Sequence, residues 1–352
     1  MRYLRHVLLL SSITGLFLSF PSFGQEAATG ASRQARLREL IARSLLGNDT
    51  APSQEERSQV TRDDVAILLD LGLDKDLNYS FRRRAFAFLE AMPDERIITP
   101  FVTYYRHCLK TPDVACDLAD QIRRISARYY RETKDQRILA LYVDVLRDPT
   151  SPPGFRLGAI RMLGLCGDSY TGDFLKTYVL WNKDYPIQYH KAEAALALAE
   201  HDDATVLDDL IALADFLRDR EEFPDARVLS AEAAVRGLAH LARTEDRAQN
   251  ALQSLAEDYC MSNSFYVYRD EHFAAGGDCI VPTLASVGRP DTLRFLENLM
   301  TRCPRPQLVK QIIRALGESG DERTQEFLRT YRQYPADVRR ALRMLERRLG
   351  PK

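Results

Sequence analysis

FRLGAIRMLG, residues 155–164, followed by Gly167 and Asp168, is the stretch that decides the fold expected for this chain. Ala159 and Leu163 stand four residues apart, so they share one face of a helix, and the small alanine lets a neighbouring helix approach closely. Gly167 can adopt the left-handed backbone conformation that ends a helix. Asp168 can begin the next helix, because its carboxylate accepts bonds from the free backbone N–H groups there. The stretch therefore predicts a helical hairpin with a tight turn.

The same spacing recurs along the chain as a basic residue, a small residue, a large apolar residue and an aspartate. Four copies are nearly complete: Arg82-Ala85-Leu89-Asp94, Arg123-Ser126-Tyr130-Asp135, Arg156-Ala159-Leu163-Asp168 and Lys191-Ala194-Leu198-Asp203. A fifth copy lacks the base, and a later one keeps only its last two positions: Ala234-Gly237-Leu241-Asp246, and Leu316 with Asp321. Neither helix of a hairpin can bury its apolar face alone, so stacking of hairpins is expected to bury it.

We therefore expect an all-α chain, a right-handed α-solenoid of about seven helical hairpins with a C-terminal capping helix from Pro335 to Leu349. The hairpins are expected to turn near Asp94, Asp135, Asp168, Asp203, Asp246, Asp291 and Asp321. The arginines of the capping helix are expected to form the polar outer face that a terminal repeat needs: Arg339, Arg340, Arg343, Arg347 and Arg348.

These residues resemble the HEAT-repeat family, in particular its bacterial-type HEAT-like (PBS-lyase-like) units. Residues 155–164 and the later stretch IIRALG, residues 312–317, carry the resemblance, which covers about residues 61–350. It implies a solenoid and leaves the activity open, since such folds host scaffolds, adaptors and a few enzymes.

Two enzymatic branches of the resemblance fit this sequence poorly. HEAT-like deoxyhypusine hydroxylases bind iron through His-Glu dipeptides, whereas this chain has only the reversed order, Glu200-His201 and Glu271-His272. PBS-lyase-like repeats occur in phycobilin lyases, which handle a tetrapyrrole on a cytosolic partner, and the expected export argues against that role. We expect no metal and no cofactor.

The first residues have the features of a secretory signal peptide. Arg2 and Arg5 precede an uncharged stretch, residues 7–20, and Ser22-Phe23-Gly24 places small residues where a signal peptidase needs them. The alternative is an uncleaved anchor, but the run is short for a bilayer span, which needs about 20 residues. The expected domains are a signal peptide (1–24), a linker with a short amphipathic helix (25–60) and a HEAT-like solenoid (61–352), in a periplasmic or secreted protein without a membrane segment after cleavage.

Export would favour pairing among the six cysteines. We expect two disulfides, Cys108 with Cys116 and Cys260 with Cys279; the alternative is that these are buried thiols. Cys166 and Cys303 are left over, and Cys166 lies at an apolar repeat position.

Composition and motifs give no sign of catalysis or nucleic-acid binding. The 49 basic and 50 acidic side chains give a formal net charge of -1, so no global field attracts nucleic acid or an anionic membrane. The chain has no zinc-protease, nucleophile-elbow, phosphate-binding or dinucleotide-binding motif, and we expect no catalytic residue. A dispersed active site is the alternative that a sequence motif would not reveal.

The most unusual segment is an aromatic insertion between repeats, bracketed by Cys260 and Cys279. Insertions in solenoids often lie on the binding face, and Tyr, Phe and Arg dominate interface energetics. The candidate partner-binding residues are Phe265, Tyr266, Tyr268 and Arg269 in the insertion, and Trp181 and Tyr185 in a second aromatic cluster. The alternative is that these aromatic residues fill gaps between repeats.

The resulting hypothesis is a non-catalytic periplasmic or secreted scaffold that binds a protein or peptide through its concave face and the 260–279 insertion. The alternative function is an enzyme or cofactor-handling protein, lyase-like or metal-dependent, with a dispersed site.

Overall fold

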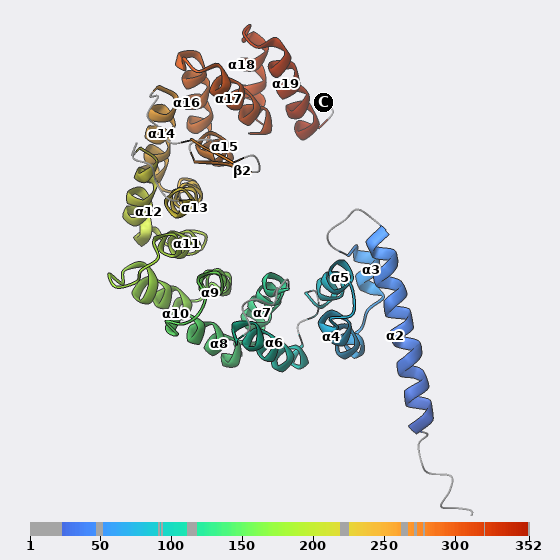
Figure 1. Ribbon diagram of the computed structural model, residues 1–352. Coiled ribbons are helices and arrows are strands. Elements are labelled where there is room, and N and C mark those ends of the chain that lie inside the picture. The colour runs from blue at the N-terminus through green and yellow to red at the C-terminus, as the bar shows by residue number, and fades with distance from the viewer. Residues whose placement is uncertain are drawn as a thin grey trace, which may run out of the picture. The chain divides into compact units, whose positions relative to one another are not determined.

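The structure is a computed structural model, and its described part is almost entirely helical (Figure 1). It describes residues 23–46, 52–90, 92, 94–110, 118–218, 225–261, 267–270, 273–276, 279–319 and 321–350. The chain divides into two compact units, Met1–Ile138 and Leu139–Lys352. Among the described helices, none has both the length and the apolar character that crossing a bilayer requires.

The described part of the Met1–Ile138 unit starts with a long helix where the sequence suggested mainly linker. Its elements are α2 (Phe23–Leu46), α3 (Gln54–Ser58), the 3-10 helix η1 (Arg62–Asp64), α4 (Val65–Leu73), α5 (Tyr79–Leu89), the 3-10 helix η2 (Glu95–Ile97), α6 (Ile98–Lys110) and α7 (Ala119–Thr133). Leu37, Leu40 and Ile41 of α2 are buried, and α2 packs against α5. The expected amphipathic stretch is thus part of a 24-residue helix that belongs to this unit's core, although Leu45 is 37% exposed.

The Leu139–Lys352 unit is built from helix pairs in two layers. Helix α8 (Gln136–Arg147) spans the boundary, and the elements that follow are α9 (Pro153–Cys166), α10 (Ser169–Phe174), the π-helix η3 (Leu175–Leu180), α11 (Gln188–Ala199), the 3-10 helix η4 (Ala204–Val206), α12 (Leu207–Ala214), the 3-10 helix η5 (Asp215–Arg218), α13 (Asp225–Leu241), α14 (Asp246–Met261), β1 (Val267–Asp270), β2 (Phe273–Gly276), α15 (Ile280–Ser286), α16 (Pro290–Arg302), α17 (Pro306–Ser319), α18 (Glu322–Thr330) and α19 (Pro335–Leu349).

First and second helices of consecutive hairpins separate into these two layers. We call α9, α11, α13, α15, α17 and α19 the A layer, because each packs against the next, and α10, α12, α14, α16 and α18 the B layer. Within this unit the helices follow an arc with the A layer on its inner side (Figure 1). The expected all-α solenoid of helical hairpins with a final capping helix is confirmed.

The predicted aspartates begin the second helices of the hairpins. Five of them accept a bond from a backbone N–H two or three residues ahead: Asp94 from Arg96 (3.0 Å), Asp135 from Arg137 (3.0 Å), Asp168 from Thr171 (2.9 Å), Asp203 from Thr205 (3.1 Å) and Asp321 from Arg323 (2.7 Å). The other two, Asp246 and Asp291, lie inside the first turn of α14 and α16, where their charge suits the helix dipole. The repeated aspartate therefore fixes where each hairpin turns.

Small residues set the spacing of the A layer. A Cβ added at Gly164 of α9 would lie 2.5 Å from the Cβ of Ala197 on α11, closer than two carbons can approach. Gly167 ends α9 with φ at 64°, in the left-handed region that the sequence predicted for it. The hairpin of residues 155–168 therefore closes and stacks as its sequence indicated.

Candidate interaction surface

Two adjoining grooves run between helices of the A layer. The first, of about 380 Å³, lies among α11, α13 and α15, and the second, of about 280 Å³, lies among α15, α17 and α19. They share Pro282 and Ser286 of α15, so together they form one continuous surface, which we call the A-layer grooves. The A layer thus carries two hollows side by side along α15.

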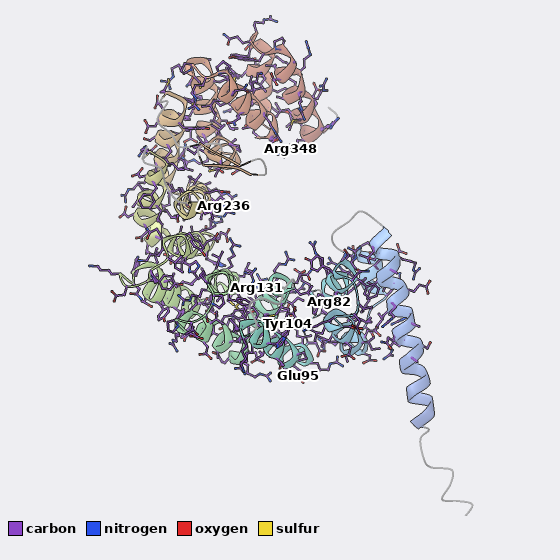
Figure 2. The ribbon with its side chains drawn as sticks, in the orientation of Figure 1. Arg82, Glu95, Tyr104, Arg131, Arg236 and Arg348 are labelled. Carbon is purple, nitrogen blue, oxygen red and sulfur yellow. The ribbon has the colours of Figure 1, made fainter. Side chains whose placement is uncertain are left out.

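Arginine side chains line both grooves. Arg236 of α13 and Arg243, two residues after that helix ends, line the first groove, and Arg348 of α19 lines the second. Figure 2 labels Arg236 and Arg348, and both stand on the inner side of this unit. The acidic residues lining the grooves are Glu200 and Glu318. The lining is therefore more basic than acidic, in contrast to the near-neutral chain.

Two carboxylates beside the groove arginines, those of Glu193 and Glu318, pair more closely with other arginines. Glu193 of α11 is 2.7 Å from an Arg161 nitrogen and 3.9 Å from the nearest Arg236 nitrogen, so its main partner is Arg161. Hydrogen bonds to Glu193 raise the pKa of the Arg161 guanidinium. The Glu318 carboxylate pairs with Arg314 at 3.1 Å, while the Arg348 guanidinium donates to the Glu318 carbonyl. Arg236 and Arg348 therefore keep positive charge for an external anion.

The 260–279 insertion contains a two-stranded antiparallel hairpin beside the A layer. Strands β1 and β2 pair with Val267 opposite Gly276 and Asp270 opposite Phe273. Strand β2 packs against α13, the helix that carries the groove residue Arg236. Phe265 and Tyr266 lie outside the described residues, while Tyr268 and Arg269 lie on β1. The insertion and the grooves thus adjoin the same helix.

The expected disulfide between Cys260 and Cys279 is not formed, since neither cysteine is disulfide-bonded. Cys260 faces another hairpin: it is fully buried near the end of α14, and the Cys303 sulfur lies 3.8 Å from its carbonyl oxygen. Cys108 is disulfide-bonded, but its predicted partner Cys116 lies outside the described residues, so that pairing stays a prediction.

The second aromatic cluster does not form one surface. Tyr185 is only 7% exposed, and its hydroxyl is hydrogen-bonded with Nδ1 of His190 at 2.9 Å. Burial raises the pKa of Tyr185 to about 12 and lowers the pKa of His190 to about 4. Trp181 is 49% exposed and donates to Asp209 of α12 at 3.1 Å, on the B-layer side. Tyr185 is therefore an interior residue, and Trp181 lies apart from the A-layer grooves.

A further cavity, of about 280 Å³, lies where the turns of two hairpins meet. Its charged and polar lining groups are used structurally: Lys176 pairs with Asp203 at 2.5 Å, and Nε2 of His201 is 2.6 Å from the Gly164 carbonyl oxygen. Burial raises the pKa of Asp203, but hydrogen bonds from Lys176 and Thr205 outweigh it and the net pKa is lowered. These contacts hold α11 against the end of α9.

Among the residues that the structure describes, no three His, Cys, Asp or Glu side chains come together in a group that could hold a metal ion.

The sequence analysis did not single out the groove arginines, although the spacing of the residues gave a signal. Arg236 and His240 are four residues apart on one face of α13, and Arg243 follows two residues after the helix ends.

Comparison with known proteins finds similarity to solved structures only at low sequence identity. No protein-family model matches the chain, and no curated protein matches it. The structure of human deoxyhypusine hydroxylase in complex with glycerol is 18% identical, covers 82% of this chain and 98% of its own, and superimposes with a TM-score of 0.35.

Proposed function

We propose that this protein is a non-catalytic, exported HEAT-like scaffold that binds an acidic segment of a protein partner along the A-layer grooves. The observation that supports the proposal is the set of three arginines, Arg236, Arg243 and Arg348, on two adjoining grooves. The hairpin of the 260–279 insertion packs on α13 and would border the bound segment.

The chemistry of the grooves favours carboxylates over other ligands. A guanidinium presents a planar fork of donors that matches a carboxylate, and such charge-assisted bonds are stronger than neutral ones. An extended acidic peptide can place several carboxylates against successive arginines of the grooves, whereas a compact ligand would contact one arginine. Because the arginines are solvent-exposed, binding should weaken as ionic strength rises.

A peptide-binding experiment tests this function. The full chain is immobilised and offered a mixture of Asp/Glu-rich, neutral and Lys/Arg-rich peptides of equal length, and affinities of retained peptides are measured by fluorescence anisotropy. We expect selective retention of acidic peptides, with affinity about tenfold or more lower in the double variant Arg236→Gln/Arg243→Gln.

A matched control comes from the other layer. Arg247 is exposed on α14 and pairs with Asp208 at 2.5 Å, so Arg247→Gln removes a surface arginine away from the grooves and should leave peptide affinity unchanged. Equal retention of neutral and acidic peptides, or equal losses in the groove and control variants, would contradict the proposal.

Export is tested separately. When the complete sequence is expressed in a bacterium with its own leader, we expect the protein in the periplasmic fraction with a mature N-terminus at Gln25. Intact-mass measurement of the fractionated protein checks this. An uncleaved chain in the cytosol would remove the exported part of the proposal and leave the peptide-binding part standing.

A further inference from the structure

Two cysteines from neighbouring hairpins meet in the B layer. Cys260 lies near the C-terminal end of α14, and Cys303 directly follows α16, the next helix of the same layer. The Cys303 sulfur is 3.8 Å from the carbonyl oxygen of Cys260, and both cysteines are free thiols. Far apart in sequence, they are brought together only by the stacking of α14 against α16.

Neighbouring contacts hold this junction in place. Arg305, two residues after Cys303, donates to the Tyr259 carbonyl at 2.6 Å, and its guanidinium lies 4.9 Å from the centre of the Tyr259 ring. On the exposed side, Arg302 pairs with Glu257 at 3.1 Å. Residues before and after Cys303 in the sequence, Arg302 and Arg305, therefore both contact the end of α14.

The two thiols differ in access to solvent. Cys260 is fully buried, whereas Cys303 is partly exposed. Burial, the neighbouring Cys303 and a hydrogen bond with it raise the pKa of the Cys260 thiol well above its usual range. An external reagent therefore meets Cys303 first, and Cys260 can react only with a sulfur already beside it.

We propose that Cys260 and Cys303 are a redox-active pair that forms a reversible disulfide on contact with a small-molecule disulfide such as oxidised glutathione. The Cys303 thiolate attacks one sulfur of the reagent, so that a mixed disulfide forms and one glutathione thiolate leaves. Cys260 then loses its proton and attacks the Cys303 sulfur, releasing the second glutathione. Two protein thiols are oxidised, the reagent disulfide is reduced to two thiols, and the two protons end on the released glutathione.

A disulfide between Cys260 and Cys303 would link the end of α14 to the end of α16, on either side of the insertion in the sequence. It would close a covalent loop that contains the 260–279 insertion, α15 and α16, and it would join two successive B-layer helices. In a solenoid each repeat is held mainly by its neighbours, so a cross-link between neighbours stabilises that junction directly. The inference does not depend on the identity of any partner.

Peptide mapping of the oxidised full chain tests the pairing. The reduced protein is incubated with oxidised glutathione, remaining thiols are alkylated, and the digest is analysed by mass spectrometry without reduction. We expect a cross-linked peptide that joins Cys260 to Cys303, loss of this peptide on adding dithiothreitol, and a melting temperature several degrees higher than that of the Cys303→Ser variant treated in the same way.

Three single variants separate the alternatives. Cys279→Ser should leave the cross-link intact, whereas Cys303→Ser should abolish it and leave Cys260 unmodified by glutathione. Cys260→Ser should trap the mixed disulfide on Cys303. A cross-link between Cys260 and Cys279, or wild-type protein that retains glutathione on Cys303 without an internal bond, would overturn the proposal. The wild-type map decides the question even if the buried Cys260→Ser variant does not fold.

Discussion

In three of the hairpins, the basic side chain of the repeat donates to a backbone carbonyl of the segment just before its own helix. Arg82 donates to the Gly72 carbonyl at 3.1 Å, Lys191 donates to the Asn182 carbonyl at 2.7 Å, and Arg156 donates to the Pro149 carbonyl. Carbonyls at helix ends and turns lack a helical partner, and a charged donor satisfies them with a strong bond. The basic residue of the repeat therefore tethers consecutive hairpins.

Replacing this base should cost stability where it is buried. Arg82 is 7% exposed, and Arg82→Leu removes the donor to Gly72, so we expect the free energy of unfolding to fall by about 1 to 3 kcal/mol in urea denaturation. Arg83, its exposed neighbour on α5, provides the control, and Arg83→Leu should change the value by less than about 0.5 kcal/mol. Equal effects of the two changes would mean that the tether is unimportant.

A buried histidine should make the protein sensitive to mild acid. Burial lowers the pKa of His190 to about 4, whereas an unfolded chain keeps the ordinary value of about 6.5. Between these values the unfolded chain binds a proton that the folded chain does not, so the free energy of unfolding falls as pH falls through this window. The expected contribution is about 3 kcal/mol.

Denaturation with urea at several pH values between 4 and 7 measures this slope. His190→Gln should flatten it, because the variant has no group to protonate at this position. His240→Gln, at a partly exposed histidine of α13, should keep most of the wild-type slope. A slope unchanged by His190→Gln would assign the acid sensitivity to other groups.

At the scale of the element, close approach between A-layer helices depends on glycine. A Cβ at Gly317 of α17 would lie 2.7 Å from the Cα of Ala341 and 3.0 Å from its carbonyl oxygen, and this backbone cannot move without shifting α19. We expect Gly317→Ala to destabilise the protein by about 1 to 3 kcal/mol, despite the better helix propensity of alanine.

Gly154, in the first turn of α9, is the matched control because a Cβ there meets nothing within 4 Å. Gly154→Ala should be neutral or stabilising by less than about 1 kcal/mol, since it reduces the freedom of the unfolded chain. Thermal and urea denaturation of both variants check the pair. A harmless Gly317→Ala would show that α17 and α19 pack less closely than described.

The elements were predictable from sequence where their cause is local. Asp168 caps α10 and Gly167 ends α9 through contacts within a few residues, and both follow from residue type and spacing. The same reasoning could not find the helix α2 in full, because its buried leucines pack on the distant helix α5.

The candidate site was harder to predict because its parts come from different hairpins. Cys260 faces Cys303 rather than Cys279 since α14 stacks on α16, and sequence proximity carries no information about that contact. Likewise Arg236 and Arg348 share one surface only through the packing of α13, α15, α17 and α19. The aromatic residues of the insertion could be noticed in the sequence. The arginines beside the insertion come together only because the A-layer helices stack.

At the scale of the whole molecule, the Leu139–Lys352 unit is held together mainly by contacts between neighbours. Helix α19 packs against α17, and its own side chains Val338, Ala341 and Leu345 are buried. All five of its arginines are exposed, and the last of them also lines the second A-layer groove: Arg339, Arg340, Arg343, Arg347 and Arg348. Loss of this cap should therefore weaken the adjacent hairpin far more than distant ones.

Hydrogen exchange on a cap variant tests this nearest-neighbour organisation. Leu345→Asp places a carboxylate at a fully buried position, which should undock α19 and expose the face of α17. We expect backbone amides of α17 and α18 to lose protection while those of α9 and α11 keep it, because opening stays local in a repeat array. Arg347→Asp, on the exposed face of α19, should leave the whole pattern unchanged. A uniform loss of protection across the unit in Leu345→Asp would instead mean that it unfolds as a single cooperative block.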